Sequence, residues 1–190
     1  MKVDDSGMPE ETYWNSLFDI PQIVKWLALE NVAAPIVEIG CGYGTFTVPI
    51  AAATSAEVYA FDIDSSMIET AGINSRQAGL RNIHFSLRDI VLEGTGLRSG
   101  SADMVLLFNI LHFDERRTLL REASRLLAPD GVVAIVHWRK DIATPRGPSV
   151  HLRPDRQMIL DSIWDLDLSL IGNDTILEPH HWGIQLIKRP

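Results

Sequence analysis

Residues 36–46 read IVEIGCGYGTF, an apolar run followed by three glycines at alternate positions. The apolar run is typical of a buried strand, and the residues after Gly44 are typical of a helix. Glycine has no Cβ and is permitted at positive φ, so a ligand can lie directly against such a turn. A strand, a glycine turn and a helix in this order predict a small-molecule site at the carboxyl edge of a parallel sheet.

The composition sets limits on the kind of protein. The chain has 190 residues, 46% of them hydrophobic, and a net charge of −8, which together predict one domain over residues 1–190 with a sizeable core. Residues 1–11 are polar and acidic, unlike a signal peptide, and we expect a cytoplasmic protein. The charge argues against a nonspecific nucleic-acid binder, because such proteins need a basic face. No apolar run is long enough to cross a bilayer.

The one cysteine, Cys41, lies inside the glycine turn. It excludes an internal disulfide and a cysteine-based zinc cluster. Two interpretations stay open for it: a small buried apolar residue, which is common for cysteine, or a nucleophile.

Strand-like and helix-like segments alternate along the middle of the chain. This alternation predicts an α/β fold, with a mainly parallel sheet covered by helices on both faces. The expected strands are residues 36–39, 57–61, 83–87, 104–108 and 132–137. The expected helices are residues 46–53, 65–78 and 115–127. Pro129-Asp130-Gly131 predicts a turn before the last of these strands.

The two ends of the chain have different patterns. Residues 9–30 predict two short helices, which either pack on the core or form a lid over the site. Residues 140–154 hold three prolines and predict an ordered loop, and a helix follows over about 155–164. Residues 168–177 and 182–188 are strand-like, and the connection between them is too short for a helical crossover, so they are expected to be antiparallel neighbours.

Polar side chains follow three of the expected strands. Asp62 ends the second strand, 18 positions after Gly44, where a nucleoside-binding sheet places an acid for the ribose hydroxyls. Asp64 stands where a helix cap is expected. Asp89 follows the third strand and can accept a hydrogen bond from an adenine amine. Asn109 ends the fourth strand.

These features, in this order and spacing, resemble the class I S-adenosylmethionine-dependent methyltransferases, above all the small-molecule group called type 11 or type 25. The resemblance runs motif by motif from Ile36 to Trp138. It implies a Rossmann-like sandwich whose seven-stranded sheet has the order 3-2-1-4-5-7-6, with strand 7 antiparallel. One departure is Ala128-Pro129-Asp130-Gly131, where the family commonly shows Lys-Pro-Gly-Gly; the turn is kept.

The resemblance also implies roles for individual residues. Glu38 and the glycine turn would hold the methionine part of S-adenosylmethionine, with Asn109 near the transferring methyl group. Asp62 would hold the ribose, and Ile63, Asp89 and Ile90 would meet the adenine. The full set of implied cofactor contacts is Glu38, Gly40, Cys41, Gly42, Gly44, Asp62, Ile63, Met67, Asp89, Ile90 and Asn109.

A nicotinamide or flavin dinucleotide is the competing cofactor. Its G-x-G-x-x-G fingerprint needs a glycine where this chain has Thr45. The Glu38 carboxylate also suits an ammonium group better than a phosphate. We therefore expect S-adenosylmethionine, with S-adenosylhomocysteine as its product.

The acceptor side is less defined in the sequence. His112 and His137 are candidates for a general base, although a histidine that only holds a loop explains either equally well. Adjacent strand residues point oppositely, so His180 and His181 do not predict a metal site, and no metal is expected. The 146–149 loop, with His151 and Arg153, can bind an anionic acceptor, or its arginines can pair with acidic residues.

Three functions remain open at this stage. The leading hypothesis is methyl transfer to an unidentified small molecule, since a chain of this length has few residues outside the core that could bind a polymer. The alternatives are a noncatalytic module of the same fold that binds the cofactor or a partner, and a nucleic-acid or protein methyltransferase. The charge disfavours nucleic acid, and Asn109-Ile110-Leu111-His112 is not an Asn/Asp-Pro-Pro-Tyr-like motif. The sequence allows a monomer or a homodimer.

Overall fold

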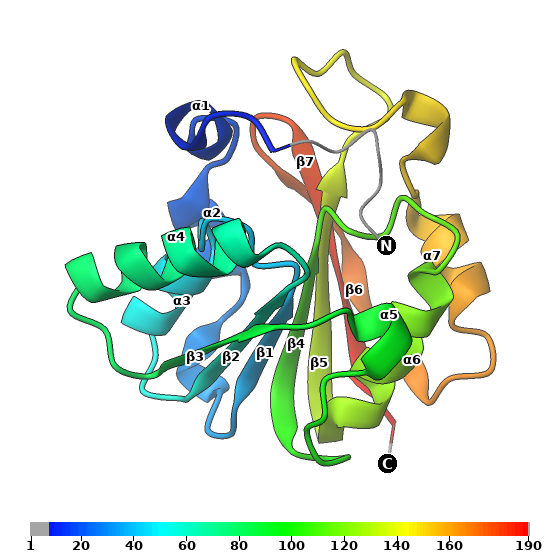
Figure 1. Ribbon diagram of the computed structural model, residues 1–190. Coiled ribbons are helices and arrows are strands. Elements are labelled where there is room, and N and C mark those ends of the chain that lie inside the picture. Colours follow the sequence, from blue (N-terminus) through cyan, green and yellow to red (C-terminus); the bar gives the residue numbers. More distant parts are fainter. Residues whose placement is uncertain (1–7, 190) are drawn as a thin grey trace.

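A computed structural model describes residues 8–189, which form one seven-stranded sheet between two layers of helices (Figure 1). The strand order is β3-β2-β1-β4-β5-β7-β6. Strand β7 runs antiparallel to β5 and β6, and the other pairs are parallel. The fold class, the strand order and the antiparallel closing pair predicted above are therefore confirmed. The strands are β1 Ile36–Ile39, β2 Val58–Asp62, β3 Ile83–Leu87, β4 Ala102–Phe108, β5 Leu127–Trp138, β6 Leu168–Leu177 and β7 His181–Lys188.

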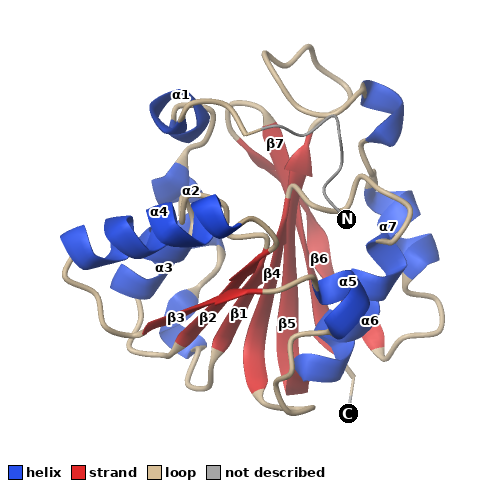
Figure 2. Ribbon diagram, in the orientation of Figure 1, coloured by secondary structure: helices blue, strands red, loops and turns tan. Residues whose placement is uncertain are grey.

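The helices are divided between the two faces of the sheet (Figure 2), with α2, α3 and α4 on one side and α5, α6 and α7 on the other. Four of them begin at an aspartate whose carboxylate accepts hydrogen bonds from the first free N–H groups: Asp19, Asp64, Asp89 and Asp155. The helices are α1 Glu11–Asn15, α2 Ile20–Trp26, α3 Thr47–Ala52, α4 Ser65–Gln77, α5 Ile90–Glu93, α6 Arg116–Leu126 and α7 Arg156–Ser162, with 3-10 turns at Leu29–Asn31 and Val150–Leu152.

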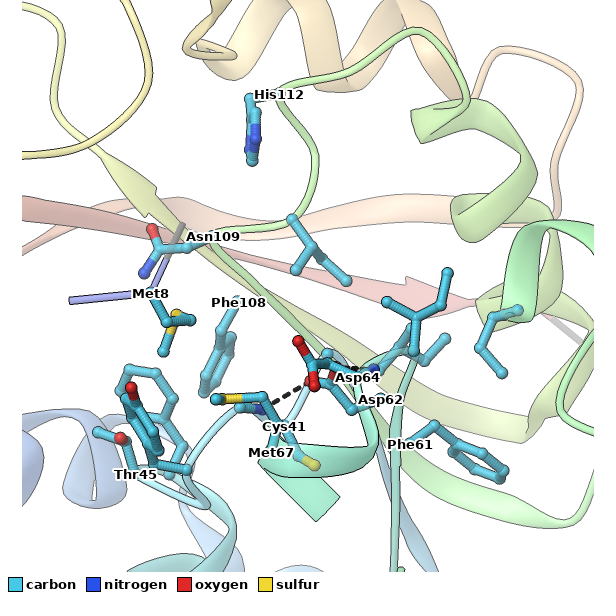
Figure 3. Close-up of a pocket in the computed structure, with 18 of the residues that line it drawn as sticks. Met8, Cys41, Thr45, Phe61, Asp62, Asp64, Met67, Phe108, Asn109 and His112 are labelled. Carbon is cyan, nitrogen blue, oxygen red and sulfur yellow. Dashed lines mark hydrogen bonds between the residues drawn. The ribbon is translucent and has the colours of Figure 1, made fainter. Parts of the chain in front are cut away.

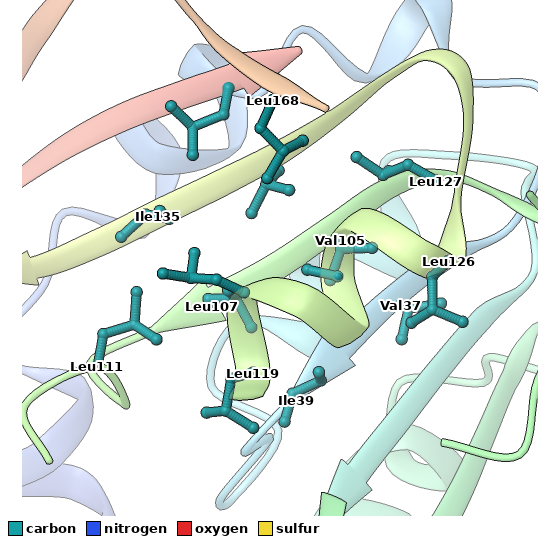
Figure 4. Close-up of a cluster of buried hydrophobic side chains, with 14 of the residues drawn as sticks. Val37, Ile39, Val105, Leu107, Leu111, Leu119, Leu126, Leu127, Ile135 and Leu168 are labelled. Carbon is teal, nitrogen blue, oxygen red and sulfur yellow. The ribbon is translucent and has the colours of Figure 1, made fainter. Parts of the chain in front are cut away.

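The core has one layer on each face of the sheet. Figure 4 shows the layer beneath α6, where Val37, Val105 and Leu107 of the central strands meet Leu119 and Leu126. On the opposite face, side chains from the alternate strand positions pack against α2 and α3. All four residues of β1 are buried, as expected for a central strand covered on both faces. A fully buried aliphatic side chain of this kind stabilises the fold by roughly 1.5–3 kcal/mol.

Two local expectations differ from the structure. Pro129-Asp130-Gly131 does not separate α6 from β5 as a turn. These residues belong to β5, where Asp130 takes a left-handed φ of 64° and the pairing with β4 shifts between Ala102 and Met104. Helix α5 was not expected at all, although Asp89 is a typical cap for its first turn. No helix among the described residues is long and apolar enough to cross a membrane.

Candidate functional site

The carboxyl ends of β1, β2 and β4 border a cavity of about 640 Å³ (Figure 3). Strand β1 pairs with β2 on one side and β4 on the other, so the chain order reverses at this point of the sheet. Ligands of open α/β sheets bind in the crevice at such a reversal. The cavity is therefore where the sheet topology places a ligand.

The glycine turn forms the floor of the cavity. Gly40, Gly42 and Gly44 have φ values of 81°, 53° and 79°, a region that other residues rarely adopt. Gly40 and Cys41 donate their backbone N–H groups to the carbonyl of Phe61, which ties the turn to the end of β2. A Cβ on Gly40 would lie 2.8 Å from Ile110, so the turn packs closely against the loop that follows β4.

Asp62 links the turn to the second strand. Its carboxylate accepts hydrogen bonds from the backbone N–H of Gly42 at 2.8 Å and of Asp64 at 2.9 Å. Burial raises the pKa of this carboxyl above its usual value, and the two backbone bonds act against that rise. A carboxylate has about four acceptor positions, so Asp62 keeps capacity for a ligand. Asp64 caps α4, as its position in the sequence predicted.

The side chains predicted to meet the adenine surround one end of the cavity. Ile63, Asp89 and Ile90 line it, and so does Met67, which the resemblance assigned to the cofactor without a specific role. Asp89 has a second task, because its Oδ1 accepts the N–H groups at the start of α5. The structure brings these residues together as predicted, and their contacts with a cofactor stay a prediction.

Asn109 is the least satisfied polar residue of the site. It directly follows β4 with a left-handed φ of 58°, and both Oδ1 and Nδ2 are buried without a hydrogen-bond partner. A strained backbone around unpartnered buried amide atoms is typical of a functional position. In Figure 3 this side chain lies below His112 and above Met8.

Two residues assigned to the cofactor do not line the cavity, namely Glu38 and Gly44. Glu38 is fully buried beneath the turn, where Oε2 accepts a hydrogen bond from the Thr47 hydroxyl and Oε1 has no partner. We expected Glu38 to contact the methionine part directly. The structure instead places its carboxyl group behind the glycine turn, away from the cavity. Cys41 does line the cavity, but burial raises the pKa of its thiol well above the usual value, which disfavours a nucleophile.

The two candidate bases lie in different places. His112 lines the cavity, is 9% exposed, and its Nδ1 is buried without a partner. Burial lowers the pKa of His112, which keeps the ring neutral and able to accept a proton. His137 is fully buried and does not line the cavity, so the structure does not support it as a catalytic base. Its ring stands 5.8 Å from that of His112.

The 140–154 loop reaches the cavity through Arg146, Gly147 and Pro148. The expectation that Arg153 binds an acceptor is wrong. Arg153 is 5% exposed and donates to the backbone carbonyls of Pro148, Arg139 and Arg146. Its guanidinium therefore stabilises the loop conformation and does not line the cavity.

No sequence pattern indicated that aromatic side chains line the cavity. Trp14, Phe46, Phe108 and Trp138 border the cavity, together with Met8 from the amino-terminal segment. The one available signal was position, since Phe108 and Trp138 end strands at the carboxyl edge of the sheet. Trp14 comes from α1, too far along the chain for any local pattern to place it.

The amino-terminal segment is attached to the rim of the cavity by side-chain hydrogen bonds. Tyr43 donates to the carbonyl of Pro9, and Thr45 donates to the side chain of Asn15. Asn74 of α4 donates to Glu11 and to the carbonyl of Tyr43. The two short helices α1 and α2 are as predicted; α1 lies above α2 in Figure 1, and its Trp14 lines the cavity.

The histidines of the closing strands have different surroundings. His181 is fully buried and stacks on Phe18 at 4.4 Å between ring centroids, whereas His180 is only partly buried. Among residues 8–189 no group of three or more histidines, cysteines or carboxylates is placed to hold a metal ion.

The fold and the site define an α/β protein that binds a nucleoside-containing ligand at the reversal of its sheet. A profile of the methyltransferase-domain family matches residues 36–131, half of the chain. The protein belongs to this family, as the motifs predicted.

Solved structures with the same fold cover nearly the whole chain. An S-adenosylmethionine-dependent methyltransferase from Aquifex aeolicus is 19% identical, with a TM-score of 0.81, over 98% of this chain and 100% of that one. Magnesium protoporphyrin IX methyltransferase from Synechocystis, solved with bound S-adenosylhomocysteine, is 17% identical, with a TM-score of 0.70, over 96% and 89%. The cyclase SpnF is 14% identical, with a TM-score of 0.75, over 98% and 84%.

Proposed function

We propose that the protein transfers a methyl group from S-adenosylmethionine to a small-molecule acceptor by in-line displacement. One observation carries the proposal: the left-handed glycine turn, Asp62 and the unpartnered amide of Asn109 converge on one cavity at the reversal of the sheet. Membership of the methyltransferase-domain family supports the reaction class. The related methyltransferase with bound S-adenosylhomocysteine supports the cofactor.

The residues of the cavity fit this cofactor. The turn exposes backbone without side chains, so the methionine part can lie against it. The amide of Asn109 offers a donor and an acceptor that the protein itself leaves unused. Asp62 and Asp89 provide negative charge for a ligand that carries a sulfonium and an ammonium group.

When bound, S-adenosylmethionine supplies a methyl group that is already electrophilic, so the protein mainly positions and encloses the reactants. In the proposed site the glycine turn and Asn109 would orient the methionyl part, and Asp62 would accept hydrogen bonds from the ribose hydroxyls. The α1 segment acts as a lid that keeps water out. His112, which lines the cavity, accepts a proton when the acceptor releases one.

Calorimetry with S-adenosylhomocysteine and with S-adenosylmethionine tests the cofactor. Absence of both binding heat and a thermal shift would contradict the proposal. Binding without transfer of label from the methyl donor to a metabolite extract would instead favour a noncatalytic module. We include the label-transfer measurement because the same fold also occurs in SpnF, which is named as a cyclase and not as a methyltransferase.

A matched pair of glycine variants localises the binding. Gly40→Ala and Gly79→Ala both force a left-handed alanine, at φ 81° and 72°, and each loses roughly 1–2 kcal/mol of stability for that reason. The added methyl group meets Ile110 at 2.8 Å in the first variant, and nothing within 4 Å in the second. We expect Gly40→Ala to weaken cofactor binding by about tenfold or more, and Gly79→Ala to leave it unchanged. Equal effects of the two would argue against a site on the turn.

A further inference from the structure

Each glycine of the turn leaves one side of its Cα open, where another residue would carry its Cβ. A Cβ on Gly40 would meet the side chain of Ile110 at 2.8 Å. A Cβ on Gly44 would meet Ala71 and Val48 at 3.3 Å each. Ala71 belongs to α4 and Val48 to α3, and Ile110 packs against the core. The open sides of these two glycines are therefore filled by side chains of the packed fold.

The open side of Gly42 has a different neighbour. A Cβ there would meet the terminal methyl group of Met8 at 3.2 Å, and apart from the flanking residues no other described atom lies within 4 Å. Both Met8 and Gly42 line the cavity, and Met8 is only partly buried. In Figure 3 the Met8 side chain lies below Asn109 and above Cys41. The middle glycine of the turn is thus covered by the end of a flexible side chain from the amino-terminal segment.

The chain next to Met8 is attached to the same turn. Tyr43, the residue after Gly42, donates its hydroxyl to the carbonyl of Pro9 at 2.7 Å. Glu10 then caps α1, because its carboxylate accepts the first free N–H groups of that helix. These bonds hold the backbone beside Met8. The methionine side chain itself is unbranched and has three rotatable bonds, so it can turn away while the backbone stays attached.

We propose that, in the ligand-free protein, the Met8 side chain occupies the place of the methionyl part of S-adenosylmethionine and has to swing out before the cofactor binds. The inference rests on the proposed methyl transfer, in which the methionyl part lies against the glycine turn. A methyl group in contact with Gly42 excludes a ligand atom from the same position. Only molecules with Met8 displaced can then bind, so the apparent affinity is lowered by the fraction of such molecules.

Removal of the Met8 side chain should tighten binding of ligands that carry the amino-acid part, and of those alone. S-adenosylhomocysteine has this part and adenosine lacks it. We would titrate both into the full chain and into Met8→Ala by calorimetry. We expect the variant to bind S-adenosylhomocysteine about three- to tenfold more tightly, which corresponds to an open fraction of about 0.1–0.3 in the wild type. Its affinity for adenosine should be unchanged.

Met158→Ala is the matched control. Met158 is also partly buried, but it belongs to α7 and does not line the cavity. Its removal should leave both affinities unchanged. Equal affinity of Met8→Ala and the wild type for S-adenosylhomocysteine, weaker binding by the variant, or an equal gain for adenosine would overturn the inference and leave the cofactor proposal intact. If S-adenosylhomocysteine binds neither protein, the methyl-transfer proposal itself fails, and this inference fails with it.

Oxidation of Met8 in the wild-type protein gives a second measurement that needs no variant. Hydrogen peroxide converts an accessible methionine thioether to its sulfoxide. Because the swing releases Met8 from the cavity, saturation with S-adenosylhomocysteine should accelerate its oxidation, followed by mass spectrometry of the amino-terminal peptide. Oxidation of Met158 should not change. Slower oxidation of Met8 in the presence of the ligand would mean that its side chain covers the ligand, and would overturn the inference.

Discussion

The buried carboxyl group of Glu38 should make the stability of this protein depend on pH. Burial raises its pKa from 4.5 to about 8, while the Thr47 hydroxyl lowers it and the charge of Asp62 adds to the rise. Between these two pKa values the folded protein keeps a proton that the unfolded chain releases, so raising the pH favours unfolding. At about 1.4 kcal/mol per pKa unit, this group lowers the free energy of unfolding by about 3 kcal/mol between acidic pH and neutrality. The loss is complete, at about 5 kcal/mol, once the pH has risen through the folded pKa.

Glu38→Gln isolates this contribution because an amide does not titrate. The amide brings N–H groups to a buried position where Oε1 of the glutamate has no partner. We expect the variant to be less stable than the wild type by about 1–3 kcal/mol at acidic pH, and the deficit to disappear or reverse at alkaline pH. Urea unfolding of both proteins over the pH range measures the difference. Glu69→Gln, on the exposed face of α4, is the control and should change stability by less than about 0.5 kcal/mol. A Glu38→Gln deficit that stays constant with pH would refute the reasoning.

Two further predictions concern the segments that enclose the cavity. Arg153→Met removes the guanidinium donor of three backbone carbonyls, of which that of Arg146 keeps the Thr144 hydroxyl, and should destabilise the loop by about 3 kcal/mol. Proteolysis within residues 140–154 should accelerate, while calorimetry shows unchanged cofactor affinity; the exposed Arg98→Met is its control. Asn74→Ala removes hydrogen bonds of 2.7 Å to Glu11 and 2.9 Å to Tyr43, so amide exchange in α1 should speed up several-fold. Unchanged exchange there would argue against the lid.

The cofactor half of the site was predictable because its signals are local. Each strand ends in a residue visible beside the apolar run, and the sheet topology brings those ends together without further information. The buried position of Glu38 could also have been predicted from the strand pattern. Strand residues two apart share a face, so Glu38 points with Ile36 toward α3, where Thr47 lies.

The role of Arg153 was not predictable in this way. Its three partners are backbone carbonyls, which carry no sequence signal, and they become available only once the loop has folded around the guanidinium. The difference between His112 and His137 has a similar origin. Both follow a strand pattern, but the first lies in the loop that opens on the cavity and the second still belongs to β5, inside the sheet.

The family match itself explains why the methyl donor is easier to infer than the acceptor. It covers residues 36–131, which supply the glycine turn, Asp62 and Asn109. Trp14 lies before this region, and Trp138 and Gly147 lie after it. Because these residues line the cavity from segments outside the matched region, relatives can keep the cofactor site and change the acceptor by altering only those segments. The acceptor of this protein is therefore to be sought through residues that the family motifs leave undefined.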